Sequence, residues 1–324
     1  MDPVDRRTIA RTGVSVTVLG LGTAPLGGLY LPVDPEIARR TVDAALDSGV
    51  AYLDVAPFYG LGLAEQRLGE ALRGVPRDSY TLSSKVGRLI VEDGPPSSSW
   101  AAAGRRAVFD YSRVGVLRSL EGSLERLGTD RLDIVYIHDP NDHHEEALRT
   151  AYPALEELRS QGAIGAIGYG MNHVAPLTAF VTETDADVIL CAGRYTLLDR
   201  SAADELLPRC LERGVSVVMG GVFNSGVLAD PYAADLFYDY KPASEAVVGR
   251  ARRLAELCAE HSTPLRAAAV QFPLRHDAVT SVLVGVRSPE EIADDLAMAT
   301  FPVPDALWAA LAASHAAGDG GAAH

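Results

Sequence analysis

Short runs of apolar and β-branched residues alternate along the whole chain with longer runs in which apolar residues recur every three or four positions. The longer pattern is typical of helices that bury one face, as for Val116, Leu120 and Leu124. Predicted strands cover residues 16–22, 51–54, 80–84, 132–138, 163–169, 187–191, 215–219 and 281–284. Predicted helices begin near Pro35, Leu63, Ser112, Glu145, His173, Ser201, Ser244 and Pro289.

Residues that commonly cap helices agree with these boundaries. Asp34 precedes Pro35, and Ser288 precedes Pro289, so each pair gives an N-cap followed by a proline in the first helical turn. Several glycines fall just after predicted helices, where a left-handed residue commonly ends the helix. They are Gly49, Gly74, Gly128, Gly162 and Gly214.

Eight strands that each precede a helix predict a single (β/α)8 barrel domain over residues 1–324, with residues 315–324 as a frayed tail. The rival fold is an open, doubly wound sheet, which carries a G-x-G-x-x-G turn after its first strand. Here Gly20 and Gly22 begin such a turn, but Pro25 stands where the third glycine belongs. The pattern therefore favours the barrel.

Three connections that follow strands are longer than a barrel requires, namely residues 87–111, 139–144 and 223–241. In a barrel such loops lie at the carboxyl ends of the strands, where lids and substrate walls are found. We therefore expect the site of chemistry at that end.

Composition narrows the class of partner. The chain has 43 Asp and Glu against 29 Lys and Arg, a formal net charge of −14, which argues against nucleic acid or an anionic membrane as a partner. No apolar run approaches the roughly 18 residues of a membrane-spanning helix, and the start of the chain is charged where a signal peptide would be apolar. With only three cysteines, Cys191, Cys210 and Cys258, these features predict a cytoplasmic protein.

Polar side chains stand at or just beyond the ends of three predicted strands. Asp54, Lys85 and His138 each end an apolar strand, and Tyr59 follows Asp54 in a short turn. In a barrel all four would meet at one rim. A buried ammonium favours a neighbouring phenolate, so we expect Lys85 to lower the pKa of Tyr59, with Asp54 orienting Lys85. This set suits proton transfer at a carbonyl or carbinol, with His138 donating to the substrate oxygen.

At these residues the chain resembles the aldo-keto reductase family. Residues 52–60 (YLDVAPFYG), followed by Glu65 and by Leu68 and Gly69, are similar to the family signature, as are the positions of Lys85 and His138. The resemblance extends over nearly the whole chain, including a hairpin at residues 7–18 that would floor the barrel. It implies a catalytic set of Asp54, Tyr59, Lys85 and His138, and a nicotinamide cofactor across the barrel mouth.

The family's cofactor positions carry over in part. Asn172 matches the residue that binds the carboxamide, Met171 stands where Ser is usual, and Gly220 replaces an aromatic residue that commonly stacks on the nicotinamide. Ala192 stands in place of a usual Gln. The resemblance implies a cofactor-binding set of Thr23, Asp54, Met171, Asn172, Phe223, Ser225, Gly226, Gly285, Arg287, Glu291 and Asp295.

The preference between NAD and NADP depends on the residues expected beside the adenine end of the cofactor. Gly285 replaces a common Lys and Glu291 replaces a common Arg, so positive charge is missing where a 2′-phosphate would lie, and an acid favours a ribose diol. Arg287 is an argument for NADP, because some relatives bind the phosphate there. The balance favours NAD, with NADP as the alternative.

The resemblance is sharpest to a branch with L-fucose dehydrogenase, D-threo-aldose 1-dehydrogenase and pyridoxal 4-dehydrogenase, which oxidise cyclic hemiacetals to lactones with NAD(P). It implies oxidation of a sugar lactol. Oxidation of pyridoxal, reduction of an aldehyde or ketone with NAD(P)H, and a non-enzymatic cofactor-binding regulatory subunit are the alternatives. The candidate substrate-binding residues are Tyr30, Tyr59, Trp100, His138 and Asn141.

Two further expectations are structural. The adjacent His143 and His144 lie in a polar loop, where neighbouring imidazoles rarely converge on one ion, so we expect no metal site. No predicted helix has an apolar face that demands a partner, so we expect a monomer or a weak homodimer.

Overall fold

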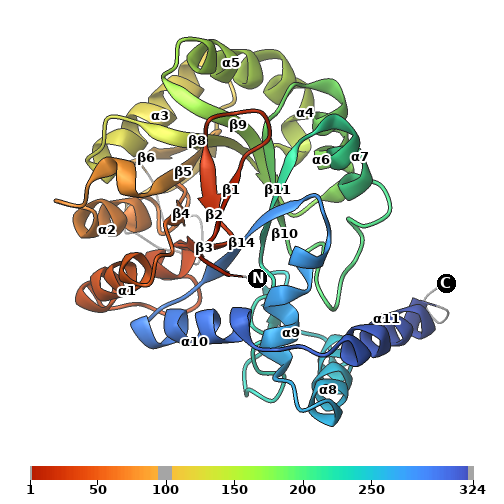
Figure 1. Ribbon diagram of the computed structural model, residues 1–324. Coiled ribbons are helices and arrows are strands. Elements are labelled where there is room, and N and C mark those ends of the chain that lie inside the picture. The colour runs from red at the N-terminus through yellow and green to blue at the C-terminus, as the bar shows by residue number, and fades with distance from the viewer. Residues whose placement is uncertain (1, 94–103, 320–324) are drawn as a thin grey trace.

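Eight parallel strands close into a barrel in the computed structural model of this protein, which describes residues 2–93 and 104–319 (Figure 1). Around the barrel the strand order is β10-β11-β14-β3-β4-β5-β8-β9. The strands are β3 (Leu19–Gly22), β4 (Tyr52–Asp54), β5 (Thr81–Val86), β8 (Leu132–His138), β9 (Ile164–Met171), β10 (Val188–Ala192), β11 (Ser216–Gly220) and β14 (Val279–Gly285). Each predicted strand is present, and closure of the barrel excludes the open sheet.

Helices surround the barrel (Figure 1). They are α1 (Pro35–Asp47), α2 (Leu63–Ala71), α3 (Arg113–Leu127), α4 (His144–Glu146), α5 (Tyr152–Ser160), α6 (Val174–Glu183), α7 (Leu206–Arg213), α8 (Glu245–Glu260), α9 (Leu265–Gln271), α10 (Pro289–Thr300) and α11 (Asp305–Asp319). A π-helical turn, Ala147–Ala151, joins α4 to α5. Short 3-10 turns lie at Ala24–Gly27, Arg77–Ser79, Asn141–His143 and Pro273–Arg275.

The predicted caps are largely confirmed. The Asp34 carboxylate accepts hydrogen bonds from the N–H groups of Glu36 and Ile37 at the start of α1. The helix predicted near Ser201 begins only at Leu206, because the Asp199 side chain accepts from the N–H and hydroxyl groups of Ser201 and holds a turn there.

The two ends of the barrel differ. A hairpin of β1 (Arg6–Thr8) and β2 (Ser15–Thr17) lies across the amino-terminal end, and Ile9 and Val16 pack into the apolar interior of the barrel. The predicted floor is thus confirmed. The opposite end, at the carboxyl ends of the strands, is where the long connections gather.

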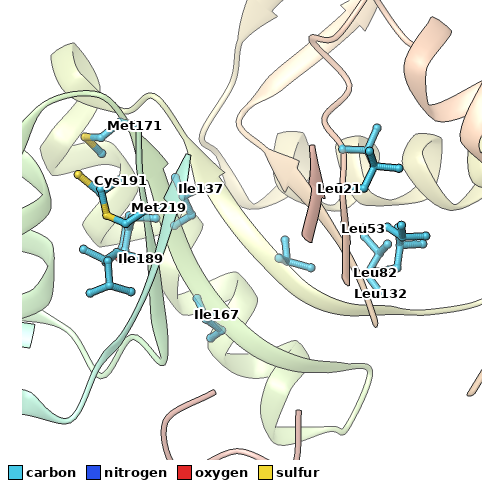
Figure 2. Close-up of a cluster of buried hydrophobic side chains, with 14 of the residues drawn as sticks. Leu21, Leu53, Leu82, Leu132, Ile137, Ile167, Met171, Ile189, Cys191 and Met219 are labelled. Carbon is cyan, nitrogen blue, oxygen red and sulfur yellow. The ribbon is translucent and has the colours of Figure 1, made fainter. Parts of the chain in front are cut away.

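A second and larger apolar layer lies between the strands and the helices. Leu53, Leu82 and Met219 belong to it, and Figure 2 shows several of its members projecting from neighbouring strands. These alternate along each strand with residues of the interior, as the two-residue period of a strand requires. The two layers hold the strand ends in fixed positions around the mouth.

The long connections contain structure that the apolar pattern did not predict. Within residues 87–111, β6 (Arg88–Val91) pairs with β7 (Arg106–Phe109) in an antiparallel hairpin. Within residues 223–241 and just beyond, β12 (Phe237–Tyr238) pairs with β13 (Lys241–Pro242). Both hairpins follow strands of the barrel and stand beside its mouth.

Two points concern the carboxyl-terminal helices. In the part of the chain that the structure describes, no single helix is long and apolar enough to cross a membrane. Helices α10 and α11 together have enough length and apolar composition for a span, but they are bent by 97° relative to one another. Helix α11 continues to Asp319, so the first residues of the tail predicted over 315–324 are helical in the structure. The remaining residues, 320–324, lie outside the described range.

A buried ion pair joins α2, α3 and β5. The Glu65 carboxylate is fully buried and accepts a hydrogen bond from Arg126 Nε at 2.6 Å and from Ser84 Oγ at 3.0 Å. Removing the cation from such a pair leaves a buried charge without compensation, which costs far more than losing an exposed pair.

We expect Arg126→Ala to lower the free energy of unfolding by about 3 kcal/mol, since Arg126 retains some exposure. Urea unfolding followed by circular dichroism measures this. Arg39→Ala is the matched control, because Arg39 pairs with Glu36 and Asp43 at the surface and its loss should cost less than about 1 kcal/mol. Equal losses in the two variants would contradict the interpretation.

Candidate active site

A buried ion pair forms the base of the site. The Lys85 ammonium, at the end of β5, lies 2.6 Å from Asp54 Oδ2 at the end of β4, with side-chain exposures of 1% and 3%. Lys85 also donates to the Val55 carbonyl at 2.9 Å, and Ser83 Oγ donates to Asp54 Oδ1 at 2.7 Å. Each charged atom therefore has close partners, which a buried pair requires.

Tyr59 stands above this pair. Lys85 Nζ lies 4.7 Å from the centroid of the Tyr59 ring, and the His138 ring meets the same ring edge-on at 6.1 Å between centroids. The turn that carries Tyr59 depends on Gly60, which has φ of +63° and whose added Cβ would lie 2.4 Å from the Gly27 carbonyl oxygen. The four predicted catalytic residues are thus brought together at one end of the barrel.

The protonation of Tyr59 differs from the expectation. Burial raises its pKa well above 10, the carboxylates of Asp54 and Asp139 raise it further, and Arg88 lowers it. The Lys85 ammonium lies against the ring, with Asp54 as its own partner at 2.6 Å. Tyr59 is therefore a neutral phenol at neutral pH in this structure.

His138 ends β8 and is almost completely buried. Burial lowers its pKa well below 6.5, and the cations Arg88 and Lys85 lower it further, so the imidazole is neutral. Its Nδ1 is buried without a hydrogen-bond partner, while its Nε2 lies 3.5 Å from Asp139 Oδ2. A neutral ring carries one N–H, which can donate to an oxygen placed near Tyr59.

A groove of about 480 Å³ runs from Tyr59 and Asp54 toward the start of α10. Most of the residues predicted to bind cofactor line it. They are Asp54, Phe223, Ser225, Gly226, Gly285, Arg287, Glu291 and Asp295. Tyr30, predicted to bind substrate, also lines it.

Besides Lys85 and His138, which contact Tyr59, four of the predicted residues do not line this groove. The Thr23 hydroxyl is buried and donates to the Asp54 carbonyl, so it fixes the backbone beneath the site. Met171 packs in the apolar layer beside Cys191, as Figure 2 shows, because its side chain points away from the barrel mouth. Asn172 and Asn141 follow β9 and β8 but do not line the groove.

The remaining predicted side chains lie close by or outside the description. Asn141 Nδ2 lies 3.0 Å from His173 Nδ1, whereas Asn141 Oδ1 is buried without a hydrogen-bond partner. Trp100 lies outside the described residues.

The β12–β13 hairpin forms one wall of the groove. Phe237 stacks on Tyr30 at 5.0 Å between ring centroids, and Tyr240 lines the groove opposite. Arg194 ties this wall to the barrel, since it bonds the Asp239 carboxylate at 2.8 Å and donates from Nε to the Asn172 carbonyl at 2.7 Å. The sequence marked the loop as a wall but did not single out Tyr240.

The far end of the groove carries matched charges. Glu291 accepts from the Arg287 N–H at 2.7 Å and from its guanidinium at 3.1 Å. Arg266, on the unpredicted helix α9, pairs with Asp294 and with Asp295. Burial raises the pKa of Asp295 to about 6, against the opposing effect of Arg266.

These features fit an extended nicotinamide dinucleotide. Gly22, Gly220 and Gly285 line the groove and leave backbone open to close approach. At Asn224, Ser225 and Gly226 three successive residues have positive φ, and Asn224 Oδ1 is buried without a partner. The N–H groups of Asn224 and Gly226 donate to the Gly221 and Phe223 carbonyls, so the Ser225 hydroxyl, which lines the groove, is the group of this turn suited to a phosphate oxygen.

Metal ligands are not assembled among residues 2–93 and 104–319, where no group of three or more His, Cys, Asp or Glu side chains could hold an ion. The neighbouring imidazoles diverge. His143 lies 3.4 Å from Glu146, whereas His144 lies 3.5 Å from Glu183.

Comparisons with known proteins agree with this geometry. The family model described as "Aldo/keto reductase family" matches residues 18–316. Pyridoxal 4-dehydrogenase of Microbacterium luteolum is 42% identical, covering 95% of this chain and 96% of its own. D-threo-aldose 1-dehydrogenase of Pseudomonas sp is 40% identical, with coverages of 94% and 95%. L-galactose dehydrogenase of Arabidopsis thaliana is 29% identical, with coverages of 93% and 89%.

A solved structure shares the architecture. The holo form of the aldo-keto reductase AKR11C1 from Bacillus halodurans superposes with a TM-score of 0.76 at 25% identity, covering 95% of each chain. The match to the family model and the two relatives above 30% identity settle the family and the class of reaction. The chain belongs to the aldo/keto reductase family and is a nicotinamide-dependent oxidoreductase acting on CH–OH groups.

Proposed function

We propose that this protein oxidises the cyclic hemiacetal form of a sugar to the lactone, with NAD as the hydride acceptor. The observation that carries the proposal is the buried Lys85–Asp54 pair beneath Tyr59, at the end of a groove shaped for a dinucleotide. Two relatives at 40% identity or more are named for pyridoxal and for an aldose, and both substrates form cyclic hemiacetals.

In the proposed reaction the anomeric hydroxyl lies between Tyr59 and His138. The neutral imidazole donates its N–H to the substrate oxygen, and Tyr59, in its phenolate form, takes the hydroxyl proton as the hydride leaves the same carbon. A bound nicotinamide supplies the acceptor for that hydride. Asp54, which accepts a hydrogen bond from Ser83, holds Lys85 under the ring, so that Tyr59 keeps one orientation as its charge changes.

A second candidate is the reverse reaction, reduction of an aldehyde. The protonation of Tyr59 favours it, because a neutral phenol is ready to donate a proton to a carbonyl oxygen. The two directions require opposite protonation states of the same residue at the start of the chemical step. Their pH profiles therefore separate them.

The preference for NAD rests on the matched charges at the far end of the groove. Arg287 is engaged by Glu291, and Arg266 is engaged by Asp294 and Asp295. A 2′-phosphate needs uncompensated positive charge, whereas a ribose diol is served by a carboxylate acceptor. The pairing supports NAD over NADP.

We also propose a cytoplasmic location and a monomeric or weakly dimeric state, with no nucleic acid as partner. The net charge of −14 supports the absence of a polyanionic partner. Cys191, Cys210 and Cys258 are all buried and free, which suits a reducing compartment.

The catalytic assignment is tested with Tyr59→Phe. We expect the rate of NADH formation from L-fucose, D-arabinose, L-galactose, L-glucose or pyridoxal to fall by about 100- to 10,000-fold, since the ring remains but the proton acceptor is lost. The initial rate at 340 nm measures this. Tyr232→Phe is the matched control, because Tyr232 is exposed and is not part of the groove lining. Unchanged turnover in Tyr59→Phe would contradict the proposed function.

The pH profile tests the direction. Because the pKa of Tyr59 is raised above 10, the phenolate fraction grows about tenfold per pH unit below it, and kcat/KM for oxidation should climb from about pH 6 to about pH 9. His138 adds no inflection in this range, because its pKa lies below 6.5. An inflection near pH 7 that disappears in Tyr59→Phe would instead mean that Lys85 lowers the Tyr59 pKa before the sugar binds, because kcat/KM reports ionisations of the enzyme without bound substrate.

The cofactor preference is tested with Glu291→Gln. We expect the wild-type protein to prefer NAD by at least about tenfold in kcat/KM, and the variant to narrow that ratio, because Arg287 loses its carboxylate partner. Glu290→Gln, an exposed neighbour outside the groove lining, should leave the ratio unchanged. A wild-type preference for NADP would overturn the assignment.

A further inference from the structure

Asp139 has a left-handed backbone conformation. It directly follows His138 and has φ of +46°, a region that residues with a side chain adopt rarely and that Asp and Asn adopt more readily than most. Contacts on both sides hold it there. Its N–H donates to the Gly170 carbonyl at 3.0 Å, and the buried Tyr111 hydroxyl lies 2.6 Å from the His138 carbonyl and 3.0 Å from the Asp139 carbonyl.

This conformation turns the carboxylate back toward the reacting groups. Asp139 Oδ2 lies 3.5 Å from His138 Nε2 and 2.5 Å from Arg88. The carboxylate is also close enough to Tyr59 to raise the pKa of that phenol. Asp139 therefore borders the space in which Tyr59 and His138 hold the substrate oxygen.

The position of Arg88 is fixed from several directions. Its guanidinium lies 4.2 Å from the centroid of Phe58 and 4.8 Å from that of Phe109. The preceding residue, Gly87, has φ of +99°, and an added Cβ would lie 2.2 Å from the Tyr111 ring. The β6–β7 hairpin is therefore packed so that Arg88 reaches Asp139.

The pair is suited to a neutral polar group. Its side chains are 16% and 26% exposed, so it borders the mouth without being fully open to solvent. Its two charges cancel, so it attracts neither an anion nor a cation strongly. Both contacts of Asp139 use Oδ2, which leaves Oδ1 with acceptor capacity, while the guanidinium has further donors.

A sugar lactol presents the matching chemistry. When its anomeric oxygen is held by Tyr59 and His138, the hydroxyl on the adjacent carbon is about a hydrogen-bond length away, on the same rim as Asp139. A carboxylate is the strongest acceptor that a side chain offers to such a hydroxyl. A hemiacetal that lacks a hydroxyl on that carbon, such as pyridoxal, gains nothing from it.

We propose that Asp139, oriented by Arg88, is a specificity-determining residue that binds the hydroxyl on the carbon next to the reacting carbon, and thereby selects 2-hydroxylated lactols. This inference rests on the proposed lactol oxidation. The inference goes beyond that function because it names the Arg88–Asp139 ion pair as the feature that selects the class of substrate.

The test compares L-fucose with 2-deoxy-L-fucose in the full-length protein and in Asp139→Asn. Asn accepts a left-handed backbone and has nearly the shape of Asp, so this variant removes the charge and keeps the turn. We expect kcat/KM to fall about 10- to 100-fold for L-fucose and less than about threefold for the 2-deoxy sugar. The inductive effect of the 2-hydroxyl cancels, because each sugar is compared with itself across the two proteins.

Two further variants keep the result interpretable. Asp142→Asn removes an exposed carboxylate from the same loop and should leave both values unchanged. Arg88→Lys retains the positive charge but not the planar fork, so it should lower kcat/KM for L-fucose selectively and by less than Asp139→Asn does.

Several outcomes would overturn the inference. An equal loss on both sugars would mean that Asp139 only positions His138, and no loss on either would mean that it does not contact substrate. Turnover of pyridoxal alone, unaffected by Asp139→Asn, would also exclude the assignment. A separate measurement tests the proposed function itself: activity that survives in Tyr59→Phe would contradict that function, whatever the result for Asp139→Asn.

Discussion

The Lys85–Asp54 ion pair is the constraint on which the site depends. Its two charges lie almost fully out of water, so each must keep its partners, and this fixes the ends of β4 and β5 relative to one another. The Tyr59 ring packs against the Lys85 ammonium, and the His138 ring packs edge-on against the Tyr59 ring. A displacement of either strand would therefore move both groups that hold the substrate oxygen.

The same pair sets the protonation of the site. Burial is the largest cause of the raised pKa of Tyr59, and the Asp54 carboxylate raises it further. Burial likewise keeps His138 neutral. The site thus begins as a neutral phenol beside a neutral imidazole, and a proton given up by the phenol leaves a phenolate next to the Lys85 ammonium.

Around this centre the two unpredicted hairpins build opposite walls. The β6–β7 hairpin brings Arg88 to Asp139, and the β12–β13 hairpin brings Phe237 to Tyr30. Each wall is tied to the barrel by an arginine, Arg88 on one side and Arg194 on the other. The barrel therefore supplies the chemistry of the family, and these ties shape the space that a substrate must enter.

The sequence by itself determined the barrel, because every strand and nearly every helix has its own apolar period and capping residues, which are local properties. It also determined that Asp54, Tyr59, Lys85 and His138 meet, because strand ends share one rim. Only the tertiary structure decided the direction of the Tyr59 pKa, the burial of Met171 and the role of Thr23, since each depends on which atoms surround a side chain. The pairing of Arg88 with Asp139 joins residues 51 positions apart, and no local pattern encodes such a contact.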